Sequence, residues 1–329
     1  MILGFKPLTI GMVILFISVA TLLPGCSRIH QVHSDLQMDH NHATATSRSN
    51  AEPESQDWAR QRLAKSPRHQ EWVKIKYKPA GASAEREVSA FVVYPEVKNK
   101  ATAVLVIHEI FGMSDWVQSL TDELAEAGYV AIAPDLLSGT GPNHGGTSDV
   151  ATAGPNAIGA AIRDLPPEQI TADLDAVAAY VTKLPAANGK LVAAGFCWGG
   201  GQTFRYATNN SRLKAAFVFY GPPPLTGQPP ALPVDKAALG KITAPVYDFY
   251  GGNDARIGAS VPATIEGMKD LKRTFEPVTY EGAGHGFMRA GDAPLPTNDA
   301  DQKKKDEYAA NKKARDEAWI RWKAILAKI

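Results

Sequence analysis

Residues 190–207 read KLVAAGFCWGGGQTFRYA, an apolar run followed by a Gly-flanked turn and a segment of small residues. The run is typical of a buried strand, and the Gly-Phe-Cys-Trp-Gly turn at 195–199 has the Gly-x-nucleophile-x-Gly form that joins a strand to a helix. Glycines remove the Cβ atoms that would clash there, and the central residue is held in a strained backbone conformation. The pattern predicts that the Cys197 thiol stands at a helix N-terminus, which favours thiolate. The alternative is a Gly-rich turn that contains a buried, inert cysteine.

Strand and helix patterns alternate on both sides of this turn. The opening strands at 72–77 and 88–94 are predicted to be antiparallel. Further strands are predicted at 103–107, 129–133, 215–219, 245–250 and 275–280, and helices at 114–127, 167–184, 259–272 and around Trp319, Trp322, Leu326 and Ile329. This alternation predicts an α/β fold with a mostly parallel central sheet and helices on both faces.

Composition narrows the class of protein. The chain has 329 residues, 44% hydrophobic and 21% charged, as in a soluble globular protein with a substantial core. The net charge of +1 gives no reason to expect a nucleic-acid partner.

The N-terminus reads as a signal peptide over residues 1–26. Lys6 precedes an apolar run at 8–23, which is shorter than the roughly 20 residues of a membrane span. Its end, Leu-Pro-Gly-Cys, resembles a bacterial lipoprotein signal, which implies lipidation of Cys26 and a lipid anchor in a membrane. Ser27 then favours outer-membrane over inner-membrane sorting, so the resemblance predicts an exported protein on the periplasmic side. An ordinary signal peptide cut elsewhere, or an uncleaved anchor, is the alternative.

Residues 27–70 are polar and aperiodic, and we interpret them as a disordered tether before a folded domain at 71–329. The tether contains His30, His33, His40 and His42. A solvated linker is favoured over a weak metal-binding tract, because no cysteine or scaffold accompanies these histidines. Since Cys26 and Cys197 are the only cysteines, acylation of Cys26 leaves Cys197 as a single thiol without a disulfide partner.

Two residues could serve a cysteine nucleophile. Asp254 follows the predicted strand at 245–250, and His285 lies in a Gly-rich loop after the strand at 275–280. Loops after the carboxyl ends of parallel strands meet at one sheet edge, so both should converge on Cys197. The order nucleophile, acid, histidine is that of α/β-hydrolases. Alternatively, Asp254 caps a turn and His285 only bonds the backbone.

Four blocks together resemble the dienelactone hydrolase family, over about residues 72–329. They are Ile-His-Glu-Ile-Phe-Gly at 107–112, Gly-Phe-Cys-Trp-Gly-Gly at 195–200, Gly-Gly-Asn-Asp at 251–254 and Gly-His-Gly-Phe at 284–287. The resemblance implies an α/β-hydrolase fold with Cys197 as nucleophile, His285 as base and Asp254 as its orienting acid. It also implies that Glu109 interacts with the resting thiol and helps it to ionise when substrate binds; a solvated loop residue is the alternative.

The oxyanion hole is expected from the backbone N–H groups of Trp198 and Ile110. Arg289 stands where the family has an arginine that binds a substrate carboxylate, unless it forms a surface salt bridge. Arg163 is a second candidate anchor without a supporting motif. His108 departs from the residue more usual before the glutamate, and the Gly-rich segment 139–159 should border the pocket, so the substrate stays open.

The resemblance predicts a hydrolase of activated esters or lactones that acts through a thioester acyl-enzyme and needs no metal or organic cofactor. Its small-molecule substrate could carry a carboxylate. Two alternatives remain: a surface protein that binds a carboxylate ligand without turnover, and a general small-acyl esterase.

Overall fold

A computed structural model of the chain describes residues 56–227, 233–291, 293, 294, 296 and 300–329. The predicted signal peptide, Cys26 and the four tether histidines lie outside these residues. The described residues form an eight-stranded sheet in the order β1-β2-β4-β3-β5-β6-β7-β8. The strands are β1 (Gln70–Tyr77), β2 (Arg86–Val93), β3 (Ala101–Ile107), β4 (Val130–Pro134), β5 (Ala187–Phe196), β6 (Ala216–Phe219), β7 (Val246–Gly251) and β8 (Phe275–Tyr280).

Pairing in the sheet is antiparallel for β1 with β2 and for β2 with β4, and parallel for every later pair. This confirms the predicted antiparallel opening and mostly parallel sheet. β3 is buried along its whole length, as its unbroken apolar sequence predicts for a strand covered on both faces.

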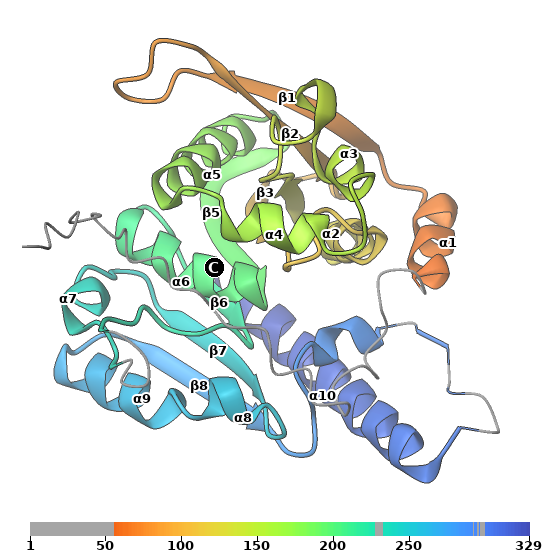
Figure 1. Cartoon of the computed structure of the whole chain (residues 1–329), viewed down its shortest axis with the longest axis vertical. Helices are drawn as coiled ribbons and strands as arrows, with labels where there is room; N and C mark the ends of the chain where they lie inside the picture. Colours follow the sequence, from red (N-terminus) through yellow and green to blue (C-terminus); the bar gives the residue numbers. More distant parts are fainter. Residues whose placement is uncertain (1–55, 228–232, 292, 295, 297–299) are drawn as a thin grey trace, which may run out of the picture. The chain divides into compact units, whose positions relative to one another are not determined.

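Helices cover both faces of the sheet (Figure 1). The longer ones are α1 (Asp57–Lys65), α2 (Asp115–Glu126), α4 (Ala157–Arg163), α5 (Pro167–Val181), α6 (Trp198–Asn209), α9 (Val261–Asp270) and α10 (Gln302–Leu326), and short turns are η2 (Pro142–His144), α3 (Thr147–Ala151), α7 (Lys236–Leu239), α8 (Ala255–Gly258) and η3 (Phe287–Ala290). α2 and α10 lie on one face and α5, α6 and α9 on the other. None of the helices in the described ranges is long and apolar enough to cross a membrane.

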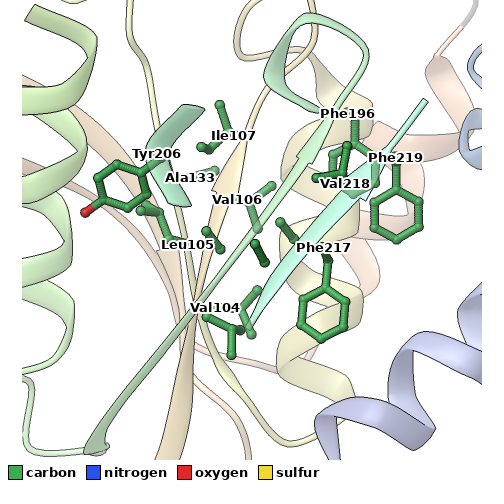
Figure 2. Packing of buried hydrophobic residues seen from close by; sticks show 14 of the residues in the cluster. Val104, Leu105, Val106, Ile107, Ala133, Phe196, Tyr206, Phe217, Val218 and Phe219 are labelled. Carbon is green, nitrogen blue, oxygen red and sulfur yellow. The ribbon is translucent and has the colours of Figure 1, made fainter. Parts of the chain in front are cut away.

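Aromatic side chains fill the space between the sheet and α10. Trp322 of α10 is fully buried, and its ring lies 4.9 Å from that of Phe219 and 6.0 Å from that of Phe196 (centroid distances). Figure 2 shows Phe217 and Phe219 of β6 on one side of the strands and Tyr206 of α6 on the other. The predicted docking of the C-terminal helix is thereby confirmed, and it supports the strands that end at the site below.

Local signals account for most element boundaries. Ser114 caps α2 at the start of the predicted helix, since its side chain accepts a hydrogen bond from the Val117 N–H, and Gly128 with a φ of +99° follows the helix end. The helix predicted at 259–272 is confirmed as α9 (Val261–Asp270), and the short helix α8 precedes it. Pro262 suits the start of α9, because proline fits the first turn of a helix.

The predicted tether is wrong over its last part, because residues 57–65 form α1 and β1 already begins at Gln70. Polar composition hid this helix, although Ala59 is fully buried and Trp58 and Leu63 pack against the core. Arg60 of α1 pairs with Asp115 at 2.9 Å, and Arg68, which follows the helix, pairs with the buried Asp122 at 2.5 Å. The folded part therefore includes residues 56–70, which precede the predicted start at 71.

Asp248 is a buried carboxyl group in the middle of β7. Its Oδ2 accepts a hydrogen bond from the Tyr250 hydroxyl at 2.6 Å, but Oδ1 has no partner among the described residues. Burial raises the pKa of Asp248 well above its ordinary value, against the opposing effect of the Tyr250 bond. The folded protein thus retains a proton here that the unfolded chain releases.

We expect Asp248→Asn to gain stability over the parent protein as pH rises. Above the unfolded pKa of about 4, the folded parent binds more protons than the unfolded chain, so its stability falls with pH by at most about 1.4 kcal/mol per unit. Asparagine can still accept the Tyr250 bond and has no proton to release. Urea unfolding at pH 5 and pH 8 measures the difference. A gap between the two proteins that stays constant over this range would contradict the account.

Candidate active site

Strand register brings the predicted site residues to one edge of the sheet. Ile107 of β3 pairs with Gly195 of β5, so Glu109 and Cys197 each lie two residues beyond neighbouring positions. On the other side of β5, Phe196 pairs with Phe219. The residues that follow β3, β5 and β6 therefore lie next to one another, as expected for the carboxyl ends of parallel strands.

Cys197 occupies the predicted strained turn. Its φ of 55° and ψ of −118° are rare for a residue with a side chain, and α6 starts at the next residue. Both flanking positions require glycine, because neighbouring backbone atoms leave no room for a Cβ. A Cβ at Gly195 would lie 2.1 Å from the Gly199 carbonyl oxygen, and one at Gly199 would lie 2.3 Å from the His108 carbonyl oxygen. The turn therefore has the geometry of a nucleophile elbow.

His285 and Asp254 lie together beside this turn. The His285 Nδ1 and the Asp254 Oδ2 are 2.5 Å apart. Asp254 also caps α8, because its Oδ1 accepts a hydrogen bond from the Ile257 N–H. Asp254 is thus both a cap and a partner of His285, and it holds the imidazole whose hydrogen bond acts on the Cys197 thiol.

The thiol and the imidazole change each other's protonation. Burial would raise the pKa of Cys197, but the charge and hydrogen bond of His285 lower it below its ordinary value. Burial would lower the pKa of His285, whereas the Cys197 charge and the hydrogen bonds to Asp254 and Cys197 raise it to about 9. Both shifts favour the thiolate–imidazolium form of the pair over the neutral form.

We expect Cys197 to react with iodoacetamide at a pH where an ordinary thiol, with a pKa of about 8.5, is largely unreactive. A lowered thiol pKa means that the thiolate, which is the form that is alkylated, appears at a lower pH. The pH midpoint of the alkylation rate is therefore lower as well. Peptide mass spectrometry of the alkylated chain over pH 5–10 separates Cys197 from Cys26. A midpoint for Cys197 at or above that of a free thiol would contradict an activated nucleophile.

Glu109 and Arg289 form a buried ion pair beside the thiol. Arg289 Nη1 donates to Glu109 Oε2 at 2.8 Å, and the guanidinium lies 5.5 Å from the Phe111 ring centroid. Among the charges that act on Cys197, Glu109 raises the pKa of the thiol and Arg289 lowers it. Glu109 is therefore no solvated loop residue, and Arg289, which is only 9% exposed, is engaged by Glu109.

Tyr220 was not predicted from the sequence as a site residue. It follows β6 with a φ of +42°, is fully buried, and its ring lies 5.1 Å from the His285 ring (centroid distance). Its hydroxyl and the Glu109 Oε1 are buried without a hydrogen-bond partner among the described residues. Such atoms are uncommon in folded proteins and concentrate where a site does chemistry. Tyr220 lies in the site because β6 pairs with β5. The sequence alone does not show that these two strands are neighbours.

The predicted oxyanion donors come from two segments, the start of α6 and the loop after β3. Trp198 is the first residue of α6, so its N–H has no acceptor within the helix. Ile110 lies in the loop after β3 and next to α4. A Cβ at Gly159 would lie 3.8 Å from the Ile110 Cγ1 and 3.6 Å from an Arg163 guanidinium nitrogen. The end of the 139–159 segment therefore borders Ile110.

Comparisons with known proteins agree with this arrangement. The model of the dienelactone hydrolase family matches residues 88–329. A Salmonella typhimurium protein named "Putative carboxymethylenebutenolidase" is 34% identical over 207 residues, which cover 61% of this chain and 73% of that protein. A Saccharolobus solfataricus protein of the same name is 29% identical over 280 residues, 74% of this chain and 95% of that protein.

Solved structures show the same fold. The crystal structure of a Klebsiella pneumoniae protein named "Putative Dienelactone Hydrolase" superposes with a TM-score of 0.61 at 25% identity and covers 79% of this chain and 100% of that one. The predicted α/β-hydrolase fold is thereby confirmed. With this match and the family match over most of its folded part, the chain belongs to the dienelactone hydrolase family, a family of carboxylic ester and lactone hydrolases.

Proposed function

We propose that this chain hydrolyses activated esters or lactones through a thioester acyl-enzyme on Cys197. The observation that carries the proposal is the contact chain at the elbow, in which Asp254 holds His285 and His285 shifts the Cys197 thiol toward thiolate. Nucleophile, base and orienting acid are the parts that covalent acyl transfer requires.

The first half-reaction forms the acyl-enzyme. The Cys197 thiolate attacks the carbonyl carbon, a C–S bond forms, and the carbonyl electron pair moves to oxygen. Trp198 and Ile110 N–H groups would stabilise that oxyanion. Collapse expels the alkoxide or enolate, which takes its proton from the His285 imidazolium. The thiolate can also leave the tetrahedral intermediate and return the substrate. The reaction therefore favours esters and lactones whose alkoxide or enolate is a good leaving group.

The second half-reaction releases the acid. His285, now neutral, accepts a proton from a water molecule as its oxygen attacks the thioester carbon. The tetrahedral intermediate collapses with cleavage of the C–S bond, and the thiolate and imidazolium pair is restored. Glu109 raises the pKa of Cys197 and Arg289 offsets it, so their ion pair would set how readily the resting thiol ionises.

We further propose that the substrate carries a carboxylate, recognised at the rim by Arg163. Arg163 is exposed, lies beside Ile110 and has no ion-pair or hydrogen-bond partner among the described residues, whereas Arg289 is engaged by Glu109. A guanidinium fits a carboxylate with two parallel hydrogen bonds.

A screen of small esters and lactones with the full chain tests both proposals, using paired substrates with and without a carboxylate. We expect turnover that Cys197→Ala removes, and a raised KM for carboxylate substrates alone in Arg163→Gln. Arg212→Gln, an exposed arginine in the loop before β6, is the matched control and should change neither. Tight binding of a carboxylic acid without hydrolysis would instead indicate a binding protein. Equal KM changes for both substrate types would contradict the role of Arg163.

For location we propose export and lipidation at Cys26, with the folded domain held on the periplasmic side of a membrane. This rests on the signal-like sequence of residues 1–26. Cys26→Ser should move the chain from the membrane to the soluble fraction of cells. An unchanged distribution would contradict lipidation.

A further inference from the structure

His108 is a buried histidine that the proposed reaction does not use. It is the first residue after β3, its side chain is fully buried, and it lies between the loop that carries Ile110 and the loop after β4. Its Nδ1 is 2.8 Å from the Glu109 carbonyl oxygen, and its Nε2 is 3.3 Å from the Leu136 nitrogen. Each ring nitrogen thus contacts the backbone of a different loop.

These two partners fix the protonation of the ring. A carbonyl oxygen only accepts a hydrogen bond and a backbone N–H only donates one, so Nδ1 carries the proton and Nε2 is the acceptor. Burial lowers the pKa of His108 against the opposing effects of Asp135 and the Glu109 carbonyl, which agrees with a neutral ring. His108 therefore acts as a fixed donor toward Glu109 and a fixed acceptor toward Leu136.

The bond to the Glu109 carbonyl sets the direction of the next N–H. The Glu109 C=O and the Ile110 N–H belong to one planar peptide group, in which they point in opposite directions. Holding the oxygen toward His108 therefore holds the Ile110 N–H away from His108. This N–H is one of the two proposed oxyanion donors.

His108 also contacts the other half of the oxyanion hole. Its ring stacks on that of Trp198, with centroids 5.5 Å apart and planes 20° apart. The His108 carbonyl oxygen lies so close to Gly199 that a Cβ there would be 2.3 Å away. His108 thus contacts Trp198 directly and bonds the peptide group that contains the Ile110 N–H.

The far end of the same loop is anchored separately. The Thr147 hydroxyl accepts a hydrogen bond from the Met113 N–H at 3.1 Å and donates to Asp135 Oδ1 at 2.8 Å. The loop from Glu109 to Met113 is therefore held at both ends. At the end that carries Ile110, the Glu109 carbonyl accepts from the Gly112 N–H at 3.1 Å within the turn and from His108, which is the side-chain contact there.

We propose that His108 is a positioning residue that orients the Glu109–Ile110 peptide, and with it the oxyanion hole, through its Nδ1–H bond. This inference rests on the proposed function, since it needs acyl transfer at Cys197. Losing an oxyanion donor costs about 10²–10³ in rate, so losing its orientation should cost less, roughly 10- to 100-fold in kcat.

Two substitutions separate the two hydrogen bonds of His108. In His108→Asn the side-chain amide occupies the Nδ1 position and can still donate to Glu109, whereas in His108→Gln the amide reaches the Nε2 position and can still accept from Leu136. We expect kcat to fall much further in H108Q than in H108N, with little change in KM. Alkylation of Cys197 by iodoacetamide should stay at the parent rate in both, because displacement of iodide develops no oxyanion.

Asp173→Asn is the control for general destabilisation. Asp173 is buried, binds Arg86 and Tyr77, and lies in α5 outside the catalytic residues. The Asp173→Asn substitution should lower the unfolding midpoint of the protein and leave its kcat unchanged. Equal kcat in H108N and H108Q, or turnover and alkylation that fall together, would overturn the role of His108. Turnover that persists in Cys197→Ala would overturn the proposed function instead, so the two failures are distinguishable.

Discussion

Cys197→Ala should lower kcat for an activated ester by roughly 10⁴–10⁶-fold, the range seen when the nucleophile of a triad is removed. The elbow places this thiol beside His285 and at the N-terminus of α6, and alanine provides neither a nucleophile nor a leaving group for the acyl-enzyme. Steady-state hydrolysis by the purified full chain measures the loss.

Cys26→Ser is the matched control for this substitution. It removes the other cysteine of the chain, which lies in the signal-like segment, and purified C26S should hydrolyse the ester at the parent rate. Because alanine is smaller than cysteine, C197A should remain folded. Turnover in C197A within about tenfold of the parent, in a chain with an unchanged unfolding midpoint, would place the chemistry elsewhere.

His285→Ala should cost nearly as much as C197A, and the double variant should cost little more than either single one. Residues that act as one unit are grossly non-additive, because removing one already disables the other. His285 lowers the pKa of Cys197, so H285A should also move the alkylation midpoint of Cys197 toward alkaline pH.

The combination of these two readouts distinguishes a base from a structural histidine. A histidine that only bonds the backbone would leave the alkylation midpoint where it is. Additive losses in the double variant would mean that Cys197 and His285 act independently. Either result would contradict the contact chain from Asp254 to the thiol.

Patterns local in sequence predicted the fold well. Apolar runs and Gly-flanked turns are one-dimensional signals, and they located the strands, the α2 cap and the elbow at Cys197. The resemblance to the dienelactone hydrolase family added Glu109 and Arg289, which form an ion pair with each other and whose charges act on the pKa of the thiol. The register of neighbouring strand ends explains why positions so far apart in the chain meet.

The features that the sequence did not predict depend on which strands are neighbours in the sheet and on which charged residues pair. Tyr220 enters the site only because β6 lies beside β5, and sequence does not give that order. The pairing of Arg289 with Glu109, rather than with a ligand or a surface acid, follows from burial. α1 was missed because its few apolar residues, Trp58, Ala59 and Leu63, stand among charged ones, some of which form ion pairs such as that of Arg60 with Asp115.

The two histidines of the site region, the half-buried His285 and the buried His108, show the same limit. His285 was predicted from its Gly-rich loop after a strand, but His108 was noted only as a departure from the usual residue. Its two backbone hydrogen bonds join loops after β3 and β4, and neither bond leaves a pattern in the sequence. A residue such as His108, which is proposed to orient another group, is identified from its contacts in the structure rather than from a sequence pattern.

The most direct test of a thioester at Cys197 is intact-mass and peptide mass spectrometry of the full chain, quenched in acid during turnover of an activated ester. We expect the acyl mass on the peptide that contains Cys197, loss of that mass with neutral hydroxylamine, and no adduct in C197A. Hydrolysis that proceeds in the parent protein without any acyl adduct on Cys197, under conditions that make deacylation rate-limiting, would contradict the account.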